Sequence, residues 1–493
     1  MTGDLPWKII SEFSVEFAAP LCNIYNTCTL EGTWPESWKH ELVTPVPKIH
    51  PPQTIDDLRK ISGTKNLSKL YEALLSETII DDLKPSVDPS QYGNAKGVSI
   101  THYLVKMINK ILSILDSNNQ QEKNAVIAQL IDWNKAFDRQ DPRLAVEAFI
   151  RNGLRPSLVP ILISYFKDRK MKVKWQGHVS TSRDLPGGNP QGCTLGMLSY
   201  GVSSNENADH VSPDMRFKFV DDLSTLEKIN LVLGGLCSYN FKNHIASDIG
   251  INQLFLPSQN FSSQESLQMI ENWTAENKSK LNSKKSNIMI FNFTDLQFTT
   301  RLYMENTLLN IVDEVKLLGT VVTSDLKWQK NTNMLTSKAF KRMIILQKLN
   351  SFQVNIPDML TIYKLYIRSI VQQNCQVWHY SLTEEEVTSI ERVQKVACKL
   401  ILKQQYGHYR DALEELNLET LAARREKLCL TFAKRTLKHP KVASMFPLNH
   451  QSQYSTRKHE KYLVQPAKTD RLKNSSIPQL QRALNADALT RKS

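Results

Sequence analysis

The stretch Phe219-Val220-Asp221-Asp222 places two adjacent carboxylates directly after an apolar pair, a pattern typical of a β-hairpin. An earlier apolar run, 125–131, ends at a third carboxylate, Asp132. Between them, the segment 187–196 is rich in glycine and contains Pro190-Gln191-Gly192, where the backbone can approach a ligand closely. Three acids around a glycine-rich turn predict a site for divalent cations and a phosphate-bearing substrate.

Each part of this pattern has a purely structural explanation when taken alone. A solvated turn accounts for most Asp-Asp pairs, and Asp132 could cap a helix that begins at Trp133. The glycine-rich segment holds more glycine and proline than an ordinary loop requires. If the acids converge, they could hold two Mg²⁺ ions roughly 3.5–4 Å apart, which activate a 3′ hydroxyl and stabilise a leaving pyrophosphate.

The composition is that of a folded protein with a polyanionic partner. The 493 residues include 62 Lys and Arg against 49 Asp and Glu, a net charge of +13, and 41% are hydrophobic. This excess favours binding to nucleic acid, although a basic protein without such a partner is the alternative. The 7 cysteines form no CxxC pair, which indicates reduced thiols, and no apolar run is long enough for a membrane span. We therefore expect an intracellular protein of more than one domain.

The order of strand-like and helix-like segments predicts an α+β fold. Apolar runs at 125–131, 215–220, 287–291 and 315–319 are strand-like, and segments with helical periodicity lie at 67–83, 99–116, 141–152 and 155–167. From about residue 333 only helices are expected, and one begins with a capping box at Thr383 and Glu386. After Asn449 the chain is basic and has few large apolar residues, which predicts a mobile tail.

Taken in order, these motifs resemble the reverse transcriptase of non-LTR (LINE-like, jockey-type) retrotransposons. The run Ile131-Asp132-Trp133-Asn134-Lys135-Ala136-Phe137-Asp138 is similar to that family's first catalytic motif. Gly188-Asn189-Pro190-Gln191-Gly192-Cys193 resembles its template- and dNTP-contacting loop, with Cys193 where serine is usual. Phe219-Val220-Asp221-Asp222 resembles its metal-binding hairpin, and Gln91-Tyr92-Gly93-Asn94 resembles a further block. The resemblance covers roughly residues 20–440.

The resemblance implies a right-hand polymerase architecture, with fingers and palm built on an antiparallel sheet and followed by an all-helical thumb and C-terminal region. The expected divisions are an N-terminal helical extension at 1–27, the reverse transcriptase domain (fingers and palm) at 28–323, the helical thumb and C-terminal region at 324–440, and a basic, mobile tail at 441–493.

The resemblance also implies roles for individual residues. The catalytic and metal-binding residues would be Asp132, Asp221 and Asp222. The residues that bind the dNTP or the template would be Arg59, Lys60, Phe137, Gln191, Gly192 and Lys285. The primer grip, similar to Lys316-Leu317-Leu318-Gly319, would use Leu318 and Gly319.

Several of these side chains have competing interpretations. Arg59 and Lys60 could be solvated surface charges, and Phe137 could be a core residue beside Ala136. Lys285 could belong to a lysine-rich turn, although the resemblance gives it the role of protonating the leaving pyrophosphate. Farther along the chain, four basic residues could follow a primer–template backbone or form the solvated face of an amphipathic helix. They are Lys338, Lys341, Arg342 and Lys348.

The predicted function is therefore that of an RNA-directed DNA polymerase, which extends a DNA primer 3′ end on an RNA template. The expected cofactor is Mg²⁺ (two ions), with Mn²⁺ as a substitute. The expected partners are the RNA template, the DNA primer or target and dNTPs, with no membrane. Its expected location is nuclear and cytoplasmic, as a ribonucleoprotein.

The start of the chain leaves an alternative open. An endonuclease domain normally precedes the polymerase in this family, whereas this chain begins almost at the polymerase motifs. We expect a truncated copy or a partial gene model, with any endonuclease supplied by a missing domain or another chain. A non-catalytic nucleic-acid-binding remnant of a retroelement is the alternative; the intact acids favour the enzyme, and the early start favours the remnant.

Overall fold

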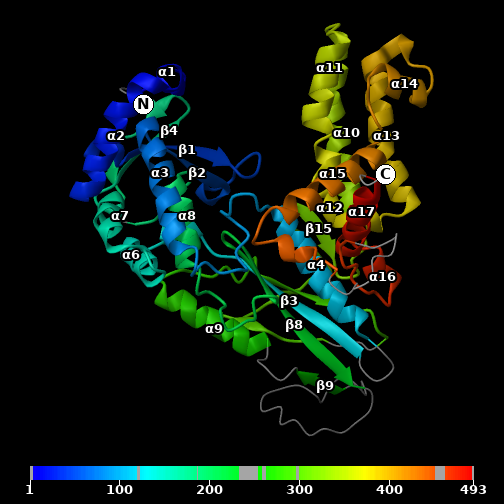
Figure 1. Ribbon diagram of the computed structural model, residues 1–493, viewed down its shortest axis with the longest axis horizontal. Helices are drawn as coiled ribbons and strands as arrows, with labels where there is room; N and C mark the ends of the chain where they lie inside the picture. Colours follow the sequence, from blue (N-terminus) through cyan, green and yellow to red (C-terminus); the bar gives the residue numbers. More distant parts are fainter. Residues whose placement is uncertain are drawn as a thin grey trace.

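The computed structural model describes residues 4–118, 123–185, 187–232, 254–257, 263–295, 299–449 and 461–490. Two groups of helices stand on either side of a central sheet, with the early helices in one group and the late helices in the other (Figure 1). Cys237 and the start of the predicted N-terminal extension lie outside the described residues. The described cysteines form no disulfide.

The first group of helices packs around a core of aromatic side chains. Trp34 stacks on Tyr71 with ring centroids 4.8 Å apart, and Tyr25 stacks on the other side of that core. The helix α2 crosses the expected boundary at 27/28, because its last turn still buries Cys28. The helices of this group are α1 (Trp7–Glu12), α2 (Ser14–Glu31), α3 (Asn66–Leu83), α5 (Ala136–Arg139), α6 (Pro142–Arg151), α7 (Val159–Phe166) and α8 (Thr194–Ser203).

A small sheet lies beside these helices. Its order is β2-β1-β4-β5, with β6 also paired to β4. The pair β1–β2 is antiparallel, whereas β1 and β4 run parallel. The strands are β1 (His40–Pro47), β2 (Leu58–Gly63), β4 (Lys170–Trp175), β5 (His178–Val179) and β6 (Arg183–Asp184).

The central sheet has the order β13-β10-β3-β8-β7, with β9 paired to β8. Helix α4 (Ile100–Asp116) covers one face and α9 (Ser263–Glu276) the other, since alternate residues of β3 belong to different cores: Val126 packs with α4, and Ile127 packs with α9. The strands are β3 (Lys123–Ile131), β7 (Arg216–Phe219), β8 (Asp222–Val232), β9 (Leu254–Pro257), β10 (Asn287–Phe291) and β13 (Asn310–Ile311). Burial on both faces explains why β3 reads as a continuous apolar run.

The late helices share one continuous core with α4 and the central sheet. Two short hairpins precede them: β11 (Tyr303–Met304) with β12 (Thr307–Leu308), and β14 (Glu314–Leu317) with β15 (Thr320–Thr323). The helices are α10 (Gln329–Ser351), α11 (Ile356–Ile362), α12 (Cys375–Trp378), α13 (Glu384–Leu402), α14 (Tyr409–Glu415), α15 (Leu421–Leu437), α16 (Asp470–Lys473) and α17 (Ser476–Thr490). The predicted capping box is present at the start of α13, where Thr383 and Glu386 bond each other's backbone N–H groups.

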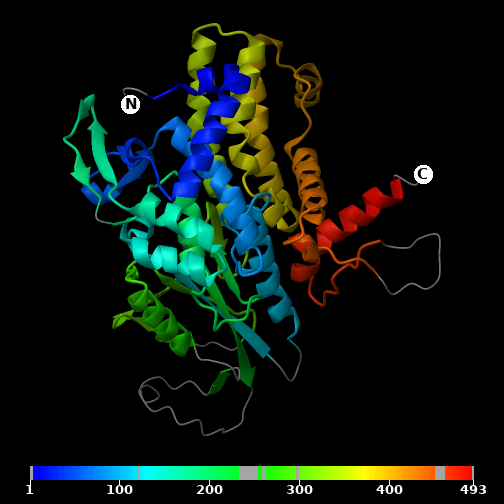
Figure 2. The same cartoon turned by 60° about the vertical axis from the view of Figure 1, so that its left-hand side comes forward.

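The described part of the tail differs from the mobile segment predicted for 441–493. Helices α16 and α17 pack on α4 and α15, and Figure 2 shows α17 beside the late helices. Leu472, Ile477 and Leu480 are buried there, whereas Leu489 of α17 is exposed. Composition suggested disorder, whereas the spacing of those few residues makes two amphipathic helices.

The predicted α+β class, with mainly antiparallel sheets followed by an all-helical region, is confirmed. The strand expected at 315–319 ends at Leu317, since Leu318 and Gly319 form the turn to β15. Within the described residues, none of the helices combines the length and apolar character needed to cross a bilayer.

Candidate active site

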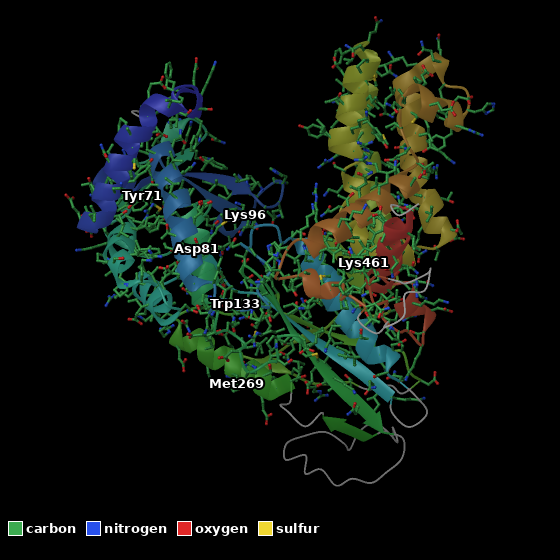
Figure 3. All side chains as sticks on the ribbon, in the orientation of Figure 1. Tyr71, Asp81, Lys96, Trp133, Met269 and Lys461 are labelled. Atoms are coloured by element: carbon green, nitrogen blue, oxygen red, sulfur yellow. The ribbon has the colours of Figure 1, made fainter. Side chains whose placement is uncertain are left out.

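Asp132, Asp221 and Asp222 come together at one end of the central sheet. Strands β3 and β8 are antiparallel with Ile131 opposite Leu223, so the same register continues to Asp132 and Asp222. Strands β7 and β8 form a hairpin that pairs Phe219 with Asp222, which leaves Val220 and Asp221 as its two-residue turn. Directly opposed residues of antiparallel strands project to the same face of a sheet. Trp133, labelled in Figure 3, lies at this end of the sheet, where the early helices meet it.

The three carboxylates are near enough to oppose one another's ionisation. Burial, followed by the carboxylates of Asp221 and Asp132, raises the pKa of Asp222 to about 7. Burial is also the main cause that raises the pKa of Asp221, and the Asp132 carboxylate adds to it. Burial raises the pKa of Asp132, whereas the neighbouring Lys285, Asn282 and Lys48 lower it. This cluster of negative charge therefore favours a proton or a cation.

The segment 280–286 holds Asp132 in place. Asn282 donates a hydrogen bond from Nδ2 to Asp132 Oδ2 at 3.0 Å, and the Asn282 backbone N–H bonds the Asp132 carbonyl oxygen at 2.8 Å. The Asp132 N–H donates to Ser286 Oγ at 3.0 Å. The positive charges of Lys285 and, more weakly, Lys48 lower the pKa of Asp132 against the effect of burial. The predicted Lys285 thus lies beside one of the three acids.

The predicted cations Arg59 and Lys60 project from neighbouring positions of β2. The positive charge of Arg59 lowers the pKa of Asp221, which places its guanidinium on the side of the turn. Lys60 instead forms an ion pair with Asp138, with Nζ and Oδ1 3.1 Å apart. Both side chains are exposed and remain accessible to an anion.

Phe137 lies against an aromatic side chain that the sequence did not single out. Its ring is 4.8 Å from the ring of Tyr200, centroid to centroid, and tilted by 31°. Burial raises the pKa of Tyr200 above its usual range, and the charges of Asp221, Asp222 and Asp132 raise it further. Tyr200 therefore contacts Phe137 and also lies near the three carboxylates. Phe137 is half-buried and packs against the hydrophobic core that contains Ala136 and Tyr200.

The glycine-rich segment joins the small sheet to the first motif. Gln191 accepts the Ser62 N–H at its carbonyl oxygen at 2.9 Å, and Asn189 donates its N–H to the Phe137 carbonyl at 2.8 Å. Gly188 has a φ of +83°, and a Cβ there would lie 2.8 Å from the Asp138 carbonyl oxygen, so only glycine fits. Gly192 is exposed, with a φ of +104°. The amide side chain of Gln191 is only partly buried.

The predicted primer grip is a hairpin tip. Leu318 and Gly319, with φ values of +46° and +85°, connect β14 to β15. A Cβ on Gly319 would lie 2.5 Å from Gln373 Nε2, so this tip is pressed against the late helices. Of the basic residues on α10, Lys338, Lys341 and Lys348 are exposed, whereas Arg342 donates from Nη1 to the Tyr366 carbonyl at 2.8 Å.

The donors at the carboxylate cluster suit a hard divalent cation, because all of them are oxygens. Within the described ranges, no group of three or more His, Cys, Asp or Glu side chains is arranged so that it could hold a metal ion. Mg²⁺ sites that act on nucleotides usually take one or two carboxylates and complete their shell with phosphate oxygens and water. The residues present fit such a shared site.

Sequence reasoning missed three residues that contact this site. They are Tyr200, which lies beside the acids, Asn282, which bonds Asp132, and Gln91, which bonds the turn before Asp221. The motif resemblance marked the segment of Gln91 but gave its side chain no role. Tyr200 lies four residues after Gly196, the end of the glycine-rich segment, in the same helix. This position next to a predicted substrate-binding segment was the signal that could have identified it.

The comparisons with known proteins agree with the motifs. The chain is 23% identical over 386 residues to the probable RNA-directed DNA polymerase from transposon X-element of Drosophila melanogaster, covering 77% of this chain and 39% of that protein. It is 24% identical over 336 residues to the probable RNA-directed DNA polymerase from transposon BS of the same fly, covering 66% and 34%. The RNA-directed DNA polymerase from mobile element jockey matches at 23% over 207 residues, covering 41% and 22%. The resemblance to the RNA-directed DNA polymerases of retrotransposons is confirmed.

This resemblance has definite limits. The chain spans about two fifths or less of the length of these retrotransposon polymerases. No protein-family model matches it. Among solved structures, apo telomerase from Candida tropicalis aligns at 12% identity and a TM-score of 0.41, covering 87% of this chain and 72% of that one. Telomerase from Candida albicans with a fragment of telomeric RNA aligns at 8% and 0.41, covering 84% and 65%.

Proposed function

We propose that this chain is an RNA-directed DNA polymerase that adds deoxynucleotides to a DNA 3′ end by two-metal nucleotidyl transfer. The observation that carries the proposal is the meeting of Asp132 with the 221–222 hairpin, which the shared register of β3 and β8 produces. The similarity to retrotransposon polymerases supports the same chemistry. The assignment of Asp132, Asp221 and Asp222 as catalytic residues is part of this proposal.

Each side chain has a distinct task in this proposal. The ionised carboxylates hold the cations, and Asn282 fixes the orientation of Asp132 through its 3.0 Å hydrogen bond. Arg59 and Lys60 balance the charge of the triphosphate from β2. Phe137 faces the sugar and disfavours a 2′ hydroxyl, while Lys285 is placed to give a proton to the departing pyrophosphate. When bound, Mg²⁺ supplies Lewis-acid chemistry to the attacking hydroxyl and the leaving group.

The proposed polymerase function also indicates the binding partners. The net charge of +13 favours a nucleic-acid duplex, whose phosphates release counterions when they meet lysine and arginine. The exposed lysines of α10 would follow the backbone of an RNA–DNA hybrid. The RNA would be the retroelement's own transcript and the primer a nicked DNA end, with any endonuclease acting from another part of the element or another chain. Such a protein would work as a ribonucleoprotein in the nucleus and the cytoplasm.

Primer extension on an RNA template tests the proposal. The wild-type chain should lengthen a DNA primer with dNTPs and Mg²⁺, and Asp221→Asn combined with Asp222→Asn should reduce the rate by at least about a thousandfold, since the charges that hold the cations are gone. The matched control is Asp81→Asn with Asp82→Asn, an adjacent acid pair on α3, of which Figure 3 labels Asp81. The control should extend the primer like the wild type.

The non-catalytic remnant predicts a different result. Wild type and site variant would then both bind an RNA–DNA hybrid with a steep dependence on salt, and neither would add a nucleotide. That outcome would end the polymerase proposal and leave nucleic-acid binding. Equal activity of the wild type and the site variant would remove the three acids from the reaction.

A further inference from the structure

The hairpin turn that carries Asp221 has an unfavourable backbone conformation. Val220 has a φ of +59°, in the left-handed region, and it is a β-branched residue. Its Cβ branches clash with the backbone in that region, so the turn is strained. The turn therefore keeps its shape only if neighbouring groups hold it. A different shape would move Asp221, the next residue.

The side chain of Gln91 provides this support. Its Oε1 accepts the Val220 N–H at 3.0 Å and also the Gly93 N–H at 2.9 Å. Gln91 is buried, and its Nε2 has no hydrogen-bond partner among the described residues. A buried donor without a partner is unfavourable, so an apolar side chain would be the more stable choice for the fold alone. The two hydrogen bonds that Gln91 Oε1 accepts offset the unfavourable burial of its Nε2.

The backbone around Gln91 is shaped to lie against the turn. A Cβ on Gly93 would come within 2.5 Å of Val220 N and 2.6 Å of Val220 Cγ2, so no other residue fits without moving the turn. The segment also extends the central sheet beyond β7, because Gln91 pairs in parallel with Lys218. The Tyr92 N–H donates to the Lys218 carbonyl at 2.7 Å, and the Lys218 N–H donates to the Ser90 carbonyl at 3.0 Å.

The late part of the chain fixes this segment from the other side. Lys441, which follows α15, donates from Nζ to the Gln91 carbonyl oxygen and, at 3.3 Å, to the Asp88 carbonyl oxygen. His439 bonds the Lys96 carbonyl oxygen through Nε2 at 2.7 Å. Lys96, labelled in Figure 3, lies between the two groups of helices. Gln91 is thus held by residues from the sheet and from the C-terminal region.

We propose that Gln91 is a positioning residue, which holds the Val220 turn so that Asp221 faces the cation site. This inference rests on the proposed polymerase function. Gln91 acts on the backbone of the turn and touches neither substrate nor metal. Loss of its oxygen leaves the fold intact and lets the turn sample other conformations.

The first test measures the turn directly, without any substrate. Gln91→Met keeps the length of the side chain and removes its acceptor. Amide hydrogen exchange at Val220 should become at least about tenfold faster, because one hydrogen bond of about 1.4 kcal/mol corresponds to that factor. Gln91→Glu, which keeps an oxygen acceptor, should retain the slow exchange. Gln394→Leu is the matched control, since this glutamine is fully buried and hydrogen-bonded far along the chain in α13.

The second test uses the reaction. Gln91→Met should raise the Mg²⁺ concentration for half-maximal primer extension several-fold and lower kcat, while the Kd for an RNA–DNA hybrid stays within twofold of the wild type. If Val220 exchanges at the wild-type rate in Gln91→Met, or if the Mg²⁺ requirement is unchanged in an active enzyme, Gln91 does not position the turn. Faster exchange throughout β3 and α13 would instead mean general destabilisation and would also overturn the proposal. If the wild type is inactive, the polymerase function is rejected. The exchange measurement at Val220 still tests whether Gln91 holds the turn.

Discussion

Phe137 and Tyr200 contact each other through their rings, 4.8 Å apart, and Tyr200 lies beside all three carboxylates. Phe137 belongs to the short helix α5, whereas Tyr200 is deep in α8. The orientation of Phe137 is thus set by a residue from another segment. A sugar that approaches the acids would meet Phe137 at an angle that Tyr200 determines.

Sugar selection should therefore depend on both rings. Phe137→Ala should increase the incorporation of ribonucleotides relative to deoxynucleotides by about 10-fold or more, since one steric contact is worth about 1–3 kcal/mol. Tyr200→Ala should have a similar, smaller effect, because Phe137 loses its support. Tyr200→Phe keeps the ring and should behave like the wild type. The measurement is the ratio of kcat/KM for the two sugars; an unchanged ratio in Phe137→Ala would remove Phe137 from the site.

Lys60 should contribute to the binding of the triphosphate. Lys60→Met is expected to raise the KM for dNTP about tenfold with a smaller change in kcat, because a bond to a charged group is worth about 1.5–3 kcal/mol. Asp138→Asn, which removes its partner at 3.1 Å, should change KM by less than about threefold, since exposed ion pairs are weak. Lys84→Met, which breaks a similar exposed pair with Asp81, is the control. Equal KM values for Lys60→Met and the control would contradict the assignment.

The raised pKa of Asp222, about 7, predicts how pH affects the metal-free protein. An ordinary aspartate ionises near pH 4 in the unfolded chain. Between about pH 4 and 7 the folded protein keeps a proton that the unfolded chain has lost, so stability falls as the pH rises through this window. The loss of stability is complete once Asp222 is ionised above pH 7. A bound divalent cation should restore the stability, because it neutralises the carboxylates.

Asp222→Asn should accordingly stabilise the metal-free protein at pH 8 and have little effect at pH 4. We expect a gain on the order of 1 kcal/mol, allowing for the solvent that reaches the half-buried group. Thermal unfolding at the two pH values, with and without Mg²⁺, measures it. Mg²⁺ should raise the Tm of the wild type at pH 8 and leave that of Asp222→Asn almost unchanged. A variant that is less stable at pH 8 would show that the acids do not repel one another.

The packing of the last helix can be tested with one side chain. Leu480 of α17 is fully buried in the core shared with α4. Leu480→Ala should reduce the free energy of unfolding by about 2–5 kcal/mol, as for other large buried side chains. Leu489→Ala, at an exposed position of the same helix, should change it by less than about 0.5 kcal/mol. Equal effects of the two variants, measured by denaturant unfolding, would mean that α17 does not pack as described.

The elements that carry the acids could be predicted from the sequence because their patterns are local. β3 is a continuous apolar run that is buried on both faces, and the Phe219–Asp222 stretch closes a tight hairpin. The side chains that support them could not, because their partners are distant in the chain. Gln91 meets Val220 129 residues later, and Asn282 meets Asp132 150 residues earlier. Only the pairing of strands brings such residues together.

The prediction of a mobile tail was wrong for a different reason. Its charge predicted mobility, yet the local spacing of Leu472, Ile477 and Leu480 suffices for helices once a surface is available to cover. That surface is provided by α4. The sequence predicted this helix but not that α16 and α17 pack on it. Composition describes a segment on its own, whereas burial depends on what it meets.

Asp116 closes α4, and its carboxylate accepts the backbone N–H groups of Lys468 and Thr469, the former at 2.9 Å and 352 residues later. During synthesis at about 5–20 residues per second, the ribosome needs roughly 20–70 s to make the intervening chain. For that time the nascent protein exposes the side of α4 that α17 later covers. A chaperone that binds apolar helices would find its target in this interval, and the demand for it should end when α17 emerges.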